Sequence, residues 1–115
     1  MENLKRGELT IVLGEKNYKG KVTMDVIMRI ENSCGMGIVK IAQTLSLGEL
    51  TTSQMVNVLT PAIRAGGNDI KEKQVGEALW GAGLADGMKA ISEILSTVLS
   101  AGEEEGNEVE ADRLV

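Results

Sequence analysis

The first strongly patterned stretch of the chain alternates apolar and polar residues, which is the period of a β-strand. Leu9, Ile11 and Leu13 fall on one face of this stretch, and residues 18–22 alternate in the same way after a glycine-containing turn. Two alternating segments joined by a short turn are typical of a β-hairpin. The pattern therefore predicts a hairpin over residues 8–22, which must pack against other elements because an isolated hairpin is marginally stable in water.

After the hairpin, apolar residues recur every three or four positions, which predicts short amphipathic helices between about residues 24 and 101. Glycines interrupt this pattern and divide it into about five helices. The clearest helix start is a capping box formed by Thr51 and Gln54, and Pro61 predicts a kink inside that helix. The predicted fold class is α+β, mostly α: an N-terminal β-hairpin followed by a bundle of about five short helices.

Charge divides the chain into a balanced body and an acidic end. Of the 17 acidic and 12 basic residues, six acidic residues and one arginine lie in residues 102–115, which leaves 11 of each sign in residues 1–101. The terminal segment has too little apolar content to offset the entropy lost on ordering. We therefore predict a single domain over residues 1–101 and a disordered acidic tail over 102–115.

Several classes of function conflict with the composition. The sequence has no histidine and one cysteine, Cys34, which leaves no Cys-His nucleophile pair and no zinc site. The glycines of residues 35–37 resemble the start of a dinucleotide loop, but Lys40 stands where the third glycine belongs. Nucleic-acid binding usually needs a basic surplus and stacking aromatics, and this acidic sequence with two aromatic residues has neither. A membrane span needs roughly 18–20 apolar residues, and no apolar run in the sequence approaches that length.

From these observations we expect a protein that is not an enzyme, has no cofactor and binds neither nucleic acid nor a membrane. A single cysteine and the lack of a signal-peptide pattern at the start of the chain favour the cytoplasm.

Methionine and tryptophan stand out because the chain has no phenylalanine and only two aromatic residues. Flexible methionines suit either an irregular core or a surface that accepts varied apolar partners, and we favour the core. For Trp80 we favour a core anchor over an interface anchor. Since core and partner contacts use the same apolar stripes, both interpretations stay open. The candidate partner-binding residues are Met36, Met55, Leu59, Trp80, Met88 and Ile91.

A series of short motifs runs through residues 6–106 in a familiar order and spacing. In chain order they are Arg6-Gly7-Glu8, Gly14, Thr23, Ile30-Glu31, Gly35 with Gly37, Ile41-Ala42, Gly48-Glu49-Leu50, Ile63-Arg64-Ala65-Gly66-Gly67, Val75-Gly76, Gly83-Leu84 and the final amphipathic helix with its Glu/Gly end. This layout resembles the tail assembly chaperone family of gene transfer agents and related long-tailed phages. The sequence departs from the family's pattern in Cys34, Trp80 and a low alanine content.

The resemblance implies a helical chaperone of the bacterial host cytoplasm without catalytic residues. Such a protein binds the tape measure protein, a long helical chain, and keeps it soluble until tube subunits assemble around it. The alternative is a structural tail or connector subunit of a phage-like particle, in which the hairpin joins a ring by strand addition. Self-association into a homo-oligomer fits the hairpin edge and the charge-balanced body.

Overall fold

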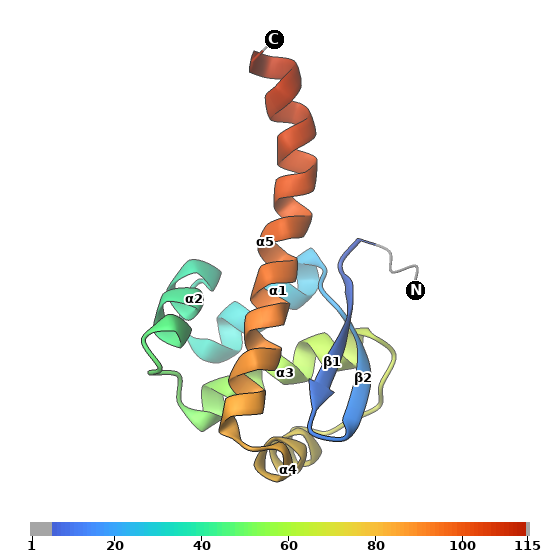
Figure 1. Cartoon of the computed structure of the whole chain (residues 1–115), viewed down its shortest axis with the longest axis vertical. Coiled ribbons are helices and arrows are strands. Elements are labelled where there is room, and N and C mark those ends of the chain that lie inside the picture. The colour runs from blue at the N-terminus through green and yellow to red at the C-terminus, as the bar shows by residue number, and fades with distance from the viewer. Residues whose placement is uncertain (1–5, 115) are drawn as a thin grey trace.

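The computed structural model describes the backbone of residues 6–114 and the side chains of residues 6–100. Two strands and five helices follow one another in this part of the chain (Figure 1). They are β1 (Glu8–Leu13), β2 (Lys16–Lys21), α1 (Met24–Cys34), α2 (Ile38–Ser46), α3 (Thr52–Ala65), α4 (Glu72–Ala82) and α5 (Leu84–Leu114). The predicted fold class, an N-terminal hairpin followed by helices in a mostly α protein, is confirmed.

The hairpin forms because a two-residue turn joins strands with one apolar face. The strands β1 and β2 pair antiparallel, with Leu9 opposite Gly20 and Leu13 opposite Lys16. Gly14 takes the first turn position with a φ of 64°, a left-handed conformation that glycine adopts without steric cost. The apolar face of β1 is buried against the helices, and α5 contacts β1 while α3 contacts β2.

Local capping fixes the starts of two helices. The Thr23 side chain accepts a hydrogen bond of 3.2 Å from the backbone N–H of Val26 at the start of α1. At the start of α3, the Thr51 hydroxyl accepts from the Gln54 N–H at 3.1 Å, and the Gln54 side chain accepts from the Thr51 N–H at 2.9 Å. This is the capping box that the sequence predicts. The helix then runs through Pro61 and ends at Ala65.

The last helix is longer than the hydrophobic period indicates. Its backbone continues as helix to Leu114, beyond residue 101 where we placed its end, and Figure 1 shows this part extending away from the rest of the protein. Glutamate and alanine favour helix without adding to an apolar stripe, so the hydrophobic period does not predict the helix that they form. The side chains of 101–115 lie outside the described residues, and the disordered acidic tail over 102–115 stays a prediction.

The core lies between the hairpin and the helices, and two glycines allow its close contacts. A Cβ atom at Gly66 would overlap the carbonyl oxygen of Lys19, so this residue lets the end of α3 approach β2. The side chain of Asn68 donates to the same oxygen at 2.8 Å. A Cβ atom at Gly87 would overlap the side chain of Leu79, so α5 also packs tightly against α4.

Helices of the described region are too short or too polar to span a membrane.

Candidate partner-binding site

The six candidate residues separate into buried and accessible groups. Met55, Leu59 and Ile91 are buried in the core, where their side chains hold the elements together. Met36 is half-buried and packs against the core. Only Trp80 and Met88 present large exposed surfaces, so they are the members of the set that a partner can reach without a change of fold.

Trp80 is 83% exposed, so the interpretation that we favoured, a core anchor, is wrong. The buried residues of α4 are Val75, Ala78 and Leu79, which share one face of the helix. Trp80 follows Leu79 directly and is turned by about 100° around the helix axis, away from that face. The prediction of a core anchor therefore assigned Trp80 to the wrong side of α4. The interface interpretation is the one that its exposure supports.

The core interpretation also fails for three of the five methionines whose side chains are described. Met55 is buried, but Met24 and Met28 lie on the outer side of α1 and are 69% and 54% exposed. Met88 is at the edge of the buried face of α5. The core replaces phenylalanine mainly with isoleucine, leucine and valine, which leaves several methionine side chains at the surface.

An apolar groove of about 670 Å³ lies between α2 and α5, and we call it the α2–α5 groove. A smaller recess of about 70 Å³ adjoins it, where Ile38 and Val39 face Leu95 and Leu99. The small side chains of Ser92, Ser96 and Ser100, four residues apart on α5, keep the groove open. Its lining residues are Ala42, Leu45 and Ser46 from α2, and Met88, Lys89, Ser92, Leu95, Ser96, Leu99 and Ser100 from α5.

This groove is apolar because α5 carries apolar residues beside its buried face as well as on it. Its most buried residues are centred on Gly87, Ile91 and Ile94. Met88 and Leu99 lie to one side of this centre and are 36% and 48% exposed. The neighbouring helix α2 covers them only in part, so both side chains remain accessible along the groove.

The apolar surface continues past the groove toward α4. Leu84 is 45% exposed and lies one helical turn before Met88 on α5. It lines a recess of about 220 Å³ together with Trp80 and residues of α3, among them Val56. Trp80, Leu84, Met88 and Leu99 therefore form a band of exposed apolar side chains that follows α5, and we call it the α5 stripe.

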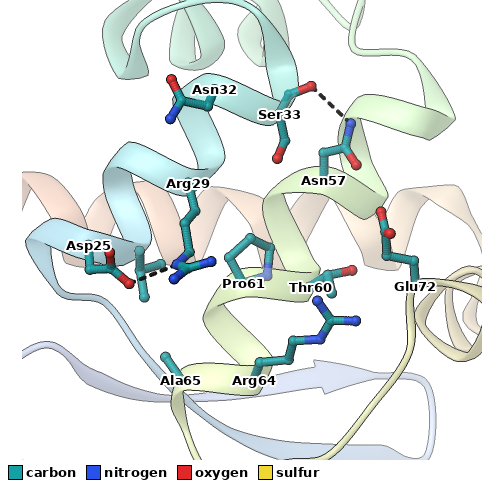
Figure 2. A pocket seen from close by; sticks show the side chains of 11 residues that line it. Asp25, Arg29, Asn32, Ser33, Asn57, Thr60, Pro61, Arg64, Ala65 and Glu72 are labelled. Atoms are coloured by element: carbon teal, nitrogen blue, oxygen red, sulfur yellow. Dashed lines mark hydrogen bonds and ion pairs between the residues drawn. The ribbon is translucent and has the colours of Figure 1, made fainter.

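A second cleft, of about 550 Å³, is polar and lies between α1 and α3 (Figure 2). Several of its polar side chains already make contacts within the protein. Arg29 Nε lies 2.8 Å from a carboxylate oxygen of Asp25, and Asn57 donates to the Ser33 carbonyl at 3.2 Å. Arg64 Nε donates to the carbonyl of Ile70 at 2.8 Å. The hydrogen bond that Arg29 donates to the Asp25 carboxylate raises the pKa of Arg29, which keeps this guanidinium charged.

The described residues offer few groups for chemistry. No cluster of three or more cysteine, aspartate or glutamate side chains suited to a metal ion occurs in the part of the chain whose side chains are described. Cys34 is half-buried, with its sulfur 3.7 Å from the carbonyl oxygen of Gln54, and burial raises the pKa of its thiol. A thiol of raised pKa is a poor nucleophile at neutral pH. The apolar groove is therefore the stronger candidate for a functional site.

The fold and the groove define a small, mostly helical α+β protein with an accessible apolar groove along its last helix. Residues 6–101 match the family described as phage tail tube protein, GTA-gp10, and the chain belongs to this family. No curated protein and no solved structure matches the chain. Membership confirms the broader part of the resemblance seen in the sequence, a tail family of phages and gene transfer agents.

Proposed function

We propose that this protein is a tail assembly chaperone, which binds amphipathic helical segments of the tape measure protein in the host cytoplasm. Binding keeps that long chain soluble while the tail assembles around it. The proposal rests mainly on one observation, the apolar α2–α5 groove with its continuation to Trp80. It involves no catalytic step and no cofactor.

The shape of the groove suits a helix. Two helices form its walls, so a third helix can pack between them with its apolar side inward. The part of the α5 stripe that lies on α5 runs from Leu84 to Leu99, which corresponds to about 22 Å, or roughly four turns, along a helix. An amphipathic segment of this length covers Met88 and Leu99 in the groove and reaches Trp80 at the end of the stripe.

The chemistry of the groove suits a partner with variable sequence. Met88 has a flexible side chain that adapts to different apolar neighbours. Serines line much of the remaining surface, and Lys89 is the charged residue among the described groove residues. Flexible and small side chains of this kind require no single arrangement of partner side chains, so the groove accepts many amphipathic segments of one long chain.

The family description favours a second candidate, a structural subunit of the tail tube. In that role the protein would remain in the finished particle and contact its neighbours in a ring, with the hairpin as one contact surface. Mass spectrometry of purified particles separates the two roles. A stoichiometric amount of this chain in the particle favours the tube subunit, and its absence favours the chaperone.

Co-expression with the tape measure protein of the same phage or gene transfer agent tests the chaperone proposal. The wild-type chain is expected to yield a soluble complex that elutes as one species in size-exclusion chromatography. Met88→Glu places a charge in the groove and Trp80→Ala removes the end anchor, so each is expected to weaken binding by roughly tenfold or more.

Met28→Glu is the matched control, because Met28 is exposed on α1 and does not line the groove. It should bind like the wild type. The proposal is wrong if the wild-type chain leaves the tape measure protein insoluble, or if Met88→Glu and Met28→Glu bind it equally well.

A further inference from the structure

The side of α5 that lines the groove has the spacing of a helix-pairing seam, with the 4% exposed Leu95 on its floor and the more exposed Met88 and Leu99 at its surface. Met88, Ser92, Leu95 and Leu99 all line the α2–α5 groove and are separated by four, three and four residues. This is the alternation of a heptad seam, in which the side chains of one helix fit between those of a second helix. The seam belongs to a helix that already has its own core face, so its natural occupant is another helix.

The seam is complementary to itself in the antiparallel direction. When a second α5 runs the opposite way, with a two-fold axis between residues 93 and 94, Met88 lies opposite Leu99 of the second copy. Ser92 then lies opposite Leu95 of the second copy, so a small side chain faces the leucine on the floor of the groove. A two-fold axis repeats each of these contacts. The arrangement therefore fills the groove of both copies at once.

The neighbouring helix α2 extends this contact. Ala42 and Ser46 line the groove with small side chains, which allow the backbone of an incoming helix to approach closely. Val39, 62% exposed, stands at the rim beside the recess with Leu99. In two copies paired in this way, the α5 helix of each copy contacts both α2 and α5 of the other, so the four helices pack together in two layers.

Charge selects the antiparallel direction. Residues 102–115 carry a net charge of −5 in the sequence, and parallel pairing would place two such segments side by side. Antiparallel pairing directs them to opposite ends of the interface. It also separates the two Lys89 residues by about 13 Å along the helix axis, since each lies level with position 98 of the other copy.

We propose that the free protein closes its α2–α5 groove with the α5 helix of a second copy, packed antiparallel across a two-fold axis. Resting on the proposed function, we further infer that a tape measure segment displaces this second copy, because both occupy the same groove. The second copy protects the apolar groove until a partner arrives.

A charge exchange between positions 88 and 99 tests the pairing and its direction. Sedimentation equilibrium of the full-length protein over a dilution series should show a species of twice the 12.2 kDa chain mass. Met88→Lys and Leu99→Glu each place one charge against an apolar side chain of the second copy, so each should weaken the dimer roughly tenfold or more. The double variant M88K/L99E should recover pairing, because each lysine meets a glutamate of the second copy. In a parallel pair, like charges would meet instead.

Circular dichroism confirms that each variant is folded, and Met28→Glu should dimerise like the wild type. A wild-type monomer throughout the series, a dimer insensitive to the single changes, or a double variant that fails to recover would each overturn the proposed pairing. A monomer that still solubilises the tape measure protein would overturn the pairing and leave the chaperone function standing. A dimer with the predicted charge pattern that never binds the tape measure protein would support the pairing and overturn the chaperone function.

Discussion

At the scale of single residues, Cys34 shows how partial burial sets the chemistry of a side chain. Cys34 is the last residue of α1 and faces α3, with its sulfur near the Gln54 carbonyl. Burial raises the pKa of the thiol above its ordinary value of 9.0, because the thiolate loses solvation in this position. The folded protein therefore holds Cys34 as a neutral thiol at physiological pH.

Alkylation should report this effect directly. Since the thiolate is the reacting form, iodoacetamide should modify Cys34 more slowly in the folded protein than in urea. The dependence of the rate on pH should also be shifted to higher pH in the folded state. Mass spectrometry of quenched samples measures both rates. Equal rates in the two states at pH 8 would contradict the account of burial.

The same pKa difference links folding to pH. A group whose pKa is higher in the folded state contributes stability that is present below its unfolded pKa and is lost as pH rises through the folded value. Stability should therefore decline above about pH 9 for this reason. In Cys34→Ser that part of the decline should be absent, which chemical denaturation at pH 8 and pH 10 can detect.

At the scale of elements, the contact between the end of α3 and β2 depends on the missing side chain of Gly66. Gly66→Ala would place a methyl group on the Lys19 carbonyl, and the backbone of one element would have to move. We expect a loss of about 1–3 kcal/mol in the free energy of unfolding. Urea denaturation followed by circular dichroism measures this change.

Gly81→Ala is the matched control, because Gly81 is helical and no atom lies within 4 Å of the added Cβ. It should stabilise the protein by about 0.5–1 kcal/mol, since alanine is the better helix former. Similar effects at the two positions would show that the α3–β2 contact adapts without cost.

Elements with a local cause could be predicted from the sequence, and contacts between elements could not. The hairpin period, the Thr23 cap and the Thr51–Gln54 capping box depend on residues a few positions apart. The orientation of Trp80 depends on which side of α4 meets α3 and α5, and an error of one residue turns it from core to surface. The α2–α5 groove arises from two helices that are some 40 residues apart, so no local pattern indicates it.

At the scale of the whole molecule, the described core extends from the first strand into the last helix. The buried hydrophobic residues begin at Leu9 and reach Leu95, with Val98 partly buried. A chain ending at residue 101 keeps all of them and should unfold with the same midpoint as the full chain. A chain ending at residue 90 lacks Ile91, Ile94 and Leu95, and it should remain unfolded.

Thermal unfolding of both truncated chains tests the predicted domain of residues 1–101. A lower midpoint for the longer truncation would mean that residues 102–115 contribute to the stability of the domain. A cooperative transition in the shorter one would mean that the hairpin and the first four helices fold without α5.

The packing of β1 against α5 has a consequence for synthesis on the ribosome. Leu13 is made early and Ile94 late, so at about 5–20 residues per second roughly 4–16 seconds separate them. During this interval the apolar face of the hairpin has no native cover from α5, which contacts β1 in the finished protein (Figure 1). The complete core therefore forms only after the first half of α5 has been translated, and a nascent chain that stalls before α5 leaves the apolar face of its hairpin without this cover.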